Sequence, residues 1–181
     1  MTTRPWFRYL RSASLVAAAL VATSATATAL TGCGNEIGDS CFLSSDCSPT
    51  GDRTCDVTQP EGYCTVLGCD YDTCPDEAVC VRFFVGSFAN KPCDPATEDL
   101  DASSATDDCS VDERCTLAGE CVPAYAEIRY CMRKCSQQDD CRTPDYECRT
   151  QDLMIEHGGE PVLAPGERAT SAQQAFCAVA P

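Results

Sequence analysis

The chain has 181 residues, 17 of them cysteine, and its 28 acidic residues outnumber the 13 basic ones to give a formal net charge of −15. This balance excludes a nucleic-acid partner, because proteins that bind nucleic acids present basic surfaces to the phosphates. It also argues against electrostatic binding to anionic membrane surfaces. The cysteine content is typical of a small disulfide-rich domain in an oxidising compartment.

Residues 1–32 are predicted to be a signal peptide. A mostly apolar run, Leu15–Leu30, follows a positively charged start, and small residues close the segment, as in secretory signals. The strongly apolar part is eight residues long, whereas a membrane-spanning helix needs roughly 20, so a transmembrane anchor is disfavoured. The only charges before Cys33 are Arg4, Arg8 and Arg11.

Two cleavage sites compete at the end of this segment. The small residues at 25–29 suit an ordinary signal peptidase. Leu30-Thr31-Gly32-Cys33 resembles the lipobox of bacterial lipoproteins, in which an aliphatic residue and two small residues precede a cysteine. The resemblance implies that the Cys33 sulfur carries a diacylglyceryl thioether and becomes the first residue of the mature protein. The alternative, that Cys33 forms a disulfide, is disfavoured because its removal leaves 16 cysteines, an even number.

The mature chain is predicted to contain two repeated halves. Its cysteines fall into four groups of four, and three of these cysteines directly follow an aspartate: Asp46, Asp108 and Asp140. Repetition of this kind indicates small stacked units. An acidic segment without cysteine, flanked by prolines, separates two groups from the other two. The expected divisions are a lipidated tether (33–40), an eight-cysteine half (41–93), an acidic linker (94–108) and a second eight-cysteine half (109–181).

All 16 cysteines after Cys33 are expected to form disulfides. The repetition suggests that each group joins its first cysteine to its third and its second to its fourth. The even count on each side of the acidic linker predicts that no disulfide joins the halves. The resulting pairs are Cys41–Cys55, Cys47–Cys64, Cys69–Cys80, Cys74–Cys93, Cys109–Cys121, Cys115–Cys131, Cys135–Cys148 and Cys141–Cys177.

The predicted fold class is small and disulfide-rich, with short β-hairpins and loops and little helix after the signal-peptide helix. Two apolar stretches, Ala78–Phe88 and the alternating residues 122–130, predict strands. Residues 149–176 are expected to form a long loop, with room for one helical turn at 170–176. Phe83 and Val85 are assigned to the core, although an exposed apolar stretch there would mark a partner-binding surface.

Catalytic and metal-binding patterns are weak. No C-x-x-C pair, H-E-x-x-H or G-x-S-x-G motif is present, and His157, the single histidine, is expected to be exposed and without function. We expect no enzymatic activity, no metal site and no cofactor besides the lipid on Cys33. Eight acids crowd into the region of the linker but lack the spacing of a calcium loop, and we expect them to be solvated: Asp94, Glu98, Asp99, Asp101, Asp107, Asp108, Asp112 and Glu113.

The stretches "GCDYDTCPDEAVCVRFF" and "YCMRKCSQQDDCR" are similar to cysteine-rich lipoproteins of myxobacteria and their relatives. The resemblance implies a bacterial cell-envelope location and brings no catalytic residues. We expect an exported protein, anchored by lipid in the inner or outer membrane, that acts as a non-enzymatic binding module for an unidentified protein or envelope ligand. Two alternatives remain: a small hydrolase using carboxylates or calcium, and a protease-inhibitor-like module with an exposed loop at Glu160–Glu167.

Overall fold

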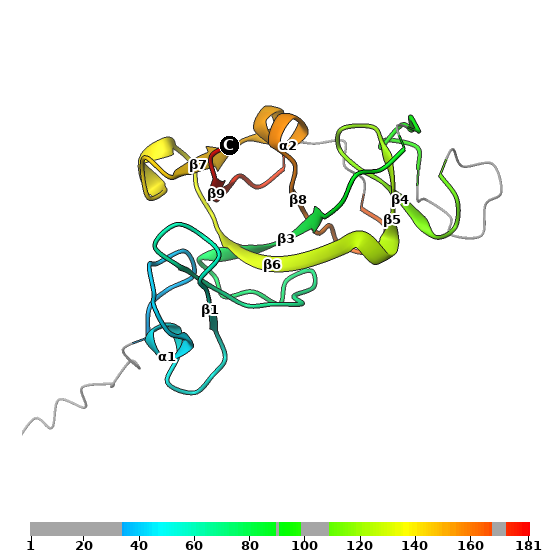
Figure 1. Cartoon of the computed structure of the whole chain (residues 1–181). Coiled ribbons are helices and arrows are strands. Elements are labelled where there is room, and N and C mark those ends of the chain that lie inside the picture. The colour runs from blue at the N-terminus through cyan, green and yellow to red at the C-terminus, as the bar shows by residue number, and fades with distance from the viewer. Residues whose placement is uncertain (1–33, 90, 99–108, 168–172) are drawn as a thin grey trace, which may run out of the picture. The chain divides into compact units, whose positions relative to one another are not determined.

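The structure, a computed structural model, describes residues 34–89, 91–98, 109–167 and 173–181, all within the unit Thr31–Pro181. Short strands and loops dominate this part of the chain (Figure 1), which confirms the predicted fold class. Cys33 and the predicted signal peptide lie outside the described residues. The elements are α1 (Ser44–Cys47), β1 (Thr54–Asp56), β2 (Tyr63–Thr65), β3 (Ala78–Phe84), β4 (Glu113–Cys115), β5 (Cys121–Pro123), η1 (Ala124–Ala126), β6 (Glu127–Arg133), η2 (Gln138–Asp140), β7 (Tyr146–Arg149), α2 (Gln151–His157), β8 (Glu160–Pro161) and β9 (Phe176–Val179).

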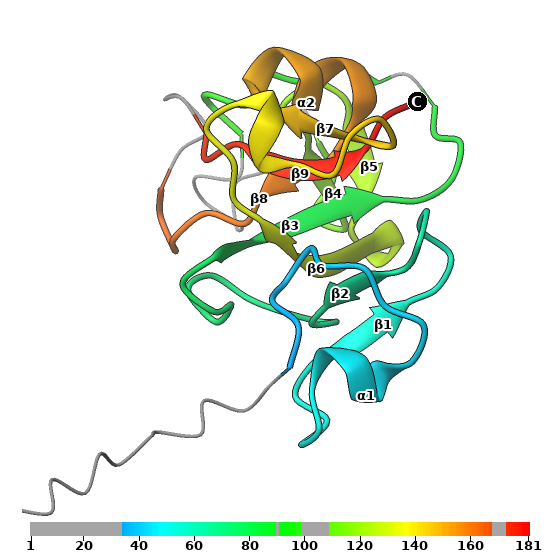
Figure 2. The ribbon, with the colours of Figure 1, turned by 90° about the vertical axis from the view of Figure 1, so that its left-hand side faces the viewer.

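The largest sheet has three antiparallel strands in the order β6-β3-β8. Strands β3 and β6 pair over their full length, from Ala78 opposite Arg133 to Phe84 opposite Glu127. Both strands contain β-branched and aromatic residues, which favour extended backbone. Figure 2 shows β1 and β2 below β6, and β7, β9 and α2 above β3. Because β3 lies before the acidic segment and β6 after it, the two predicted halves share one sheet.

Four antiparallel strand pairs each carry two cysteines directly opposite one another. The opposed cysteines are not bonded to each other; each forms a disulfide with a cysteine from the segment that precedes the first strand of the pair. Two disulfides therefore link one segment to both strands of the pair that follows it. We call the four cysteines of each such set a four-cysteine module. The opposed residues are Cys55 and Cys64, Cys80 and Cys131, Cys115 and Cys121, and Cys148 and Cys177.

Every module in the described chain joins its first cysteine to its third and its second to its fourth, so the predicted scheme is confirmed within modules. The modules are module one (Cys41–Cys55 and Cys47–Cys64), module two (Cys69–Cys80 and Cys74–Cys131), module three (Cys93–Cys115 and Cys109–Cys121) and module four (Cys135–Cys148 and Cys141–Cys177).

The grouping of the cysteines along the chain differs from the prediction. Module three is inserted between the third and fourth cysteines of module two, so the predicted pairs Cys74–Cys93 and Cys115–Cys131 are wrong. The prediction that no disulfide joins the halves is also wrong, because Cys74–Cys131 and Cys93–Cys115 both cross the acidic segment. The physical reason is the pairing of β3 with β6, which places Cys131 opposite Cys80 and within reach of the loop that holds Cys74.

The acid before the second cysteine of a module has a structural role. The Asp46 carboxylate accepts hydrogen bonds from the backbone N–H groups of Phe42 and Leu43, both at 2.9 Å. In module four the Asp140 carboxylate accepts the equivalent pair, from residues 136 and 137, at 2.7 and 3.1 Å. In module two Thr73 replaces the acid, and its hydroxyl accepts from the N–H of residue 70 at 2.8 Å. Asp108 lies outside the described residues.

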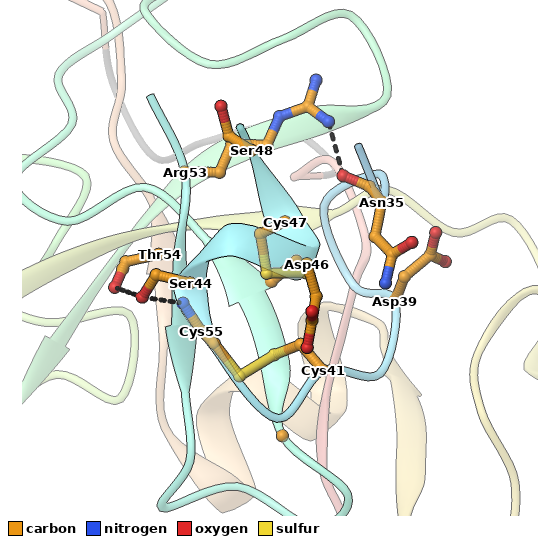
Figure 3. Close-up of a disulfide and its surroundings, with 12 residues drawn as sticks. Asn35, Asp39, Cys41, Ser44, Asp46, Cys47, Ser48, Arg53, Thr54 and Cys55 are labelled. Carbon is orange, nitrogen blue, oxygen red and sulfur yellow. Dashed lines mark hydrogen bonds between the residues drawn. A yellow bond between two sulfur atoms is a disulfide. The ribbon is translucent and has the colours of Figure 1, made fainter. Parts of the chain in front are cut away.

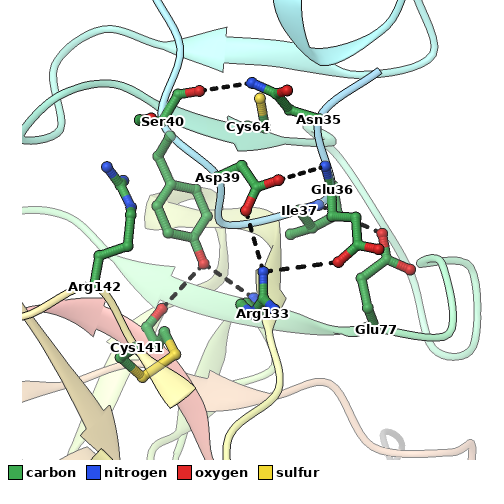
Figure 4. A network of polar contacts seen from close by, with 12 residues as sticks. Asn35, Glu36, Ile37, Asp39, Ser40, Cys64, Glu77, Arg133, Cys141 and Arg142 are labelled. Atoms are coloured by element: carbon green, nitrogen blue, oxygen red, sulfur yellow. Dashed lines mark hydrogen bonds and ion pairs between the residues drawn. A yellow bond between two sulfur atoms is a disulfide. The ribbon is translucent and has the colours of Figure 1, made fainter. Parts of the chain in front are cut away.

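The segment predicted as a lipidated tether is packed against the rest of the unit from its second residue onward. Ile37 is fully buried in the main hydrophobic cluster. The N–H of Asn35 donates to the carbonyl oxygen of Asp46 at 3.0 Å, and Arg133 of β6 lies between the carboxylates of Glu36 and Asp39 (Figure 4). Residues 34–40 therefore belong to the folded unit, and Cys33 immediately precedes it in the chain.

The strand predictions are right in place and wrong in extent. Strand β3 ends at Phe84 instead of Phe88, and the alternating stretch 122–130 is broken by the 3₁₀ turn η1 after Pro123, before β6 continues to Arg133. The expected long loop contains α2 and the short strand β8. Of the expected helical turn at 170–176, the residues up to 172 lie outside the described part and Phe176 begins β9.

We expect Gly62→Ala to unfold module one at a much lower temperature than Gly51→Ala does. Both glycines have positive φ, +68° and +85° respectively, so each alanine incurs the cost of left-handed backbone, roughly 1–2 kcal/mol. A Cβ on Gly62 would also lie 2.1 Å from the carbonyl oxygen of Cys41, whereas a Cβ on Gly51 meets nothing within 4 Å. Thermal midpoints measured by circular dichroism check this; equal midpoints would contradict the close packing.

We expect the stabilisation supplied by Asp46 and Asp140 to disappear in acid. Two backbone N–H donors hold the pKa of each carboxyl below its ordinary value. A carboxyl whose folded pKa is lowered stabilises fully above its unfolded pKa, about 3.9, and loses this contribution as the pH falls through the folded pKa. The midpoint difference between wild type and Asp140→Asn should therefore be largest near neutral pH and vanish in strong acid. Asp139→Asn, whose carboxylate accepts no hydrogen bond from the described residues, is the matched control.

Candidate functional site

A pocket of about 430 Å³ lies against one face of the β3–β6 pair. Module one forms one wall through β1, β2 and the turn between them, and β7 and β9 of module four form another. A volume of this size is in the range of small-ligand sites. The lining residues are Asp56, Thr58, Gln59, Tyr63, Thr65, Phe83, Val85, Ile128, Tyr130, Met132, Arg149, Ala178 and Val179.

Strand alternation explains why the apolar lining comes from one face of the sheet. Residues opposite one another in an antiparallel pair point to the same side, and Phe83 stands opposite Ile128. Tyr130 and Met132 follow on the same face of β6 at intervals of two. The ring of Phe83 packs edge-on against that of Tyr130, with centroids 6.1 Å apart. The pocket is therefore an open continuation of the sheet's apolar face.

The apolar stripe passes from core to surface along β3. Val81 is fully buried, Phe83 is half-buried, and Val85 is 56% exposed. On β6, Met132 is buried and Ile128 is 36% exposed. The assignment to the core is therefore right for Phe83, which packs against the main hydrophobic cluster, and wrong for Val85, which is exposed and lines the pocket.

The wall formed by module one is joined to the neighbouring strands by buried hydrogen bonds. The Tyr63 hydroxyl donates to the carbonyl oxygen of Cys177 at 3.2 Å and accepts from the N–H of Arg133 at 3.0 Å, which ties β2 to both β9 and β6. Burial raises the pKa of this hydroxyl far above its ordinary value, so Tyr63 stays neutral. Its ring stacks on that of Tyr146 at 5.5 Å. The Thr65 hydroxyl donates to the carbonyl oxygen of Cys131 at 2.8 Å. Together with Tyr63, it positions module one against the sheet.

Arg149 lines the pocket but has little free charge to offer a ligand. Its side chain is nearly buried, and its Nε donates to Glu147 at 2.8 Å. Its remaining nitrogens donate to the carbonyl oxygens of His157, Gly158 and Val179 at 2.7 to 3.1 Å. Burial alone would raise the pKa of the Glu147 carboxyl, but the hydrogen bonds from Arg149 and His157 outweigh it and hold that pKa below its ordinary value.

His157 is half-buried, so the expectation of an exposed residue is wrong. Its Nδ1 lies 2.7 Å from the Glu147 carboxylate and its Nε2 lies 3.7 Å from that of Glu156. The ring is held by the last turn of α2, an element that the sequence did not indicate. Within the described chain its side-chain partners are both acids, and this arrangement orients the ring at the end of the helix without supplying a nucleophile.

Asp56 is the other charged residue of the lining. Its carboxylate accepts from the N–H and hydroxyl of Thr58, at 3.0 and 2.6 Å, and from the side chain of Gln59 at 3.2 Å. These partners are neutral, and no basic side chain of the described residues forms an ion pair with it. The pocket thus combines an apolar sheet face with one uncompensated negative charge at the module-one wall.

The cysteine clusters offer no thiolate to a metal. Groups of three cysteine sulfurs lie close enough together to surround an ion, but the 16 described cysteines are all bonded in disulfides. Of the four described acids that were predicted to be solvated, Asp94 and Asp112 are exposed as expected, whereas Glu113 is half-buried and Glu98 is buried. Glu113 pairs with Lys91 at 2.9 Å, Glu98 is buried and accepts from the N–H of Cys109 at 3.4 Å, and Asp94 accepts from residue 96 at 2.9 Å. Residues 99–108 lie outside the described part.

The loop of the inhibitor alternative is partly tied down. Glu160 and Pro161 form β8 and pair with β3. The buried Glu160 carboxylate pairs with Arg82 at 2.6 Å and accepts from the N–H of Leu117 at 2.6 Å. The exposed part of this segment in the described structure is therefore confined to residues 165–167.

Sequence reasoning found part of this site. The apolar stretch at β3 and the alternation that ends at Tyr130 both contribute to the lining. No sequence pattern indicated that Asp56 and Arg149 line a pocket, because their place in it depends on how modules one and four pack against the sheet. Cys33 lies outside the described residues.

Comparisons with known proteins reveal no relative. No protein-family model matches the chain, and neither a curated protein nor a solved structure matches it. Within the described residues no helix has the length and hydrophobicity to span a bilayer.

Proposed function

We propose that this chain is an exported, lipid-anchored protein of a bacterial cell envelope. We also propose that its pocket binds a ligand that has both an apolar group and a positive charge. Eight disulfides among the described residues indicate an oxidising compartment outside the cytoplasm. The lipobox-like sequence ending at Cys33 supports lipid anchoring, since two or three acyl chains hold a protein stably at a membrane.

The observation that carries the binding proposal is the open apolar face beside β3 and β6. Val85 and Ile128 remain accessible on a sheet face whose neighbouring residues form the core. Exposed apolar surface next to a preformed cavity is typical of a ligand site. The disulfides of modules one and four hold the two walls in place, so the walls lose little conformational entropy when a ligand binds.

The charge preference follows from the two charged lining residues. Arg149 is neutralised by Glu147 and by three carbonyl groups, whereas Asp56 has neutral partners. The chain from Cys33 onward holds all 28 acidic residues and ten basic ones, a formal net charge of −18, which attracts cations toward the site. A basic peptide segment with an aromatic or aliphatic side chain has this chemistry. We assign the protein a binding rather than a catalytic role.

Tryptophanamide, which is aromatic and cationic, should bind the pocket. N-acetyltryptophan has the same ring with a negative charge and should bind about tenfold more weakly, a difference of about 1.4 kcal/mol. Isothermal calorimetry with the oxidised protein measures both. Val85→Arg should abolish binding, because it places a cation in the apolar lining at an exposed position. Val111→Arg, at a residue that is 83% exposed outside the pocket, is the control. Preference for the anionic probe, or equal loss in both variants, would contradict the proposal.

A further inference from the structure

Phe42 and Leu43 form an exposed apolar pair in module one. They are 84% and 65% exposed, and among the described residues they are the one pair of large exposed apolar side chains that are adjacent in sequence. Of the other exposed apolar residues, Val85 and Ile128 line the pocket, and the rest are not adjacent to one another in sequence. An adjacent pair has a larger combined apolar surface to bury against a partner.

The backbone that carries this pair is fixed. The N–H groups of Phe42 and Leu43 both donate to the Asp46 carboxylate, and α1 follows directly. Cys41 and Cys47, at either end of this segment, are bonded to the strands β1 and β2. The two side chains are therefore presented to solvent from a segment that cannot withdraw them by local rearrangement.

Gly34 and Asn35, which follow Cys33, lie beside the same segment. The N–H of Asn35 donates to the carbonyl oxygen of Asp46 at 3.0 Å, and a Cβ on Gly34 would touch the carbonyl oxygen of Cys47 at 2.6 Å. Figure 3 shows Asn35, Asp46 and the Cys41–Cys55 disulfide grouped around α1. Cys33 is two residues before Asn35 in the chain, and two residues of extended chain reach about 7 Å at most. The four residues of α1 span about 6 Å, so the anchor point and the apolar pair lie at the same end of the unit.

We propose that Phe42 and Leu43 enter the interfacial layer of the membrane that carries the lipid on Cys33, so that the unit has two membrane contacts and one defined orientation. This inference rests on the proposed lipid anchor. A membrane is the occupant that the position favours, because acyl chains attached to Cys33 would hold the bilayer surface against this end of the unit. The surrounding residues 34–55 include four acids and one arginine, so the contact is with the apolar part of the interface and does not require anionic lipid.

The test uses a tryptophan reporter. The single tryptophan of the chain, Trp6, lies in the predicted signal peptide, so in the mature protein a Phe42→Trp variant reports on position 42 alone. Tyr125→Trp is the matched control, since residue 125 is 87% exposed and lies in η1, which directly precedes β6. Each lipidated protein is reconstituted into phosphatidylcholine vesicles with and without lipid that carries a nitroxide quencher near the top of its acyl chain.

The expected result is that the nitroxide removes most of the fluorescence intensity of the Phe42→Trp variant and leaves the intensity of the Tyr125→Trp variant unchanged. Vesicles that carry the protein but leave both reporters unquenched would overturn the inference while the lipid anchor stands. If wild type fails to float with vesicles, as Cys33→Ser should, the proposed lipidation is wrong. In that case the free Cys33 thiol is coupled to a maleimide lipid, and the same comparison of the two reporters decides the inference.

Discussion

The pairing of β3 with β6 is the interaction on which the rest of this structure depends. It joins residues about fifty positions apart in the chain, and loop closure over that distance is costly before contacts form. Apolar residues of both strands offset this cost by forming the core with Phe176 and Ile37. The same pairing places Cys80 opposite Cys131, which completes module two around the inserted module three.

The position of the pocket follows from this pairing. Module one is attached to the sheet through the Tyr63 and Thr65 hydroxyls, which bond to β6 and β9, and module four contributes β7 and β9. Both modules flank the end of the sheet where its apolar face is still accessible. The disulfides alone would not hold modules one and four against the sheet, since every disulfide closes within its own module. The sheet is what brings separate modules together around a common cavity.

The sequence predicted the local chemistry of the modules better than their arrangement. The first-to-third and second-to-fourth scheme was suggested by the repetition of the cysteines, and it holds within each module because each module joins one segment to two paired strands. The grouping failed because Cys131 belongs with cysteines far from it in sequence, and only strand pairing reveals that. The helix α2, the contact of the His157 ring with Glu147 and the place of Asp56 in the pocket all depend on tertiary contacts, which local patterns do not record.

The measurement that tests this account most directly is the identity of the partner of Cys131. Trypsin cleavage of the unreduced protein, unfolded in urea with free thiols blocked, releases the four-residue peptide Tyr130–Arg133, which contains Cys131 alone. Mass spectrometry should find this peptide joined to residues 54–82, which contain Cys74, while residues 115–129 are joined to residues 83–114. Recovery of Tyr130–Arg133 joined to residues 115–129 would contradict the insertion of module three into module two, and with it the shared central sheet.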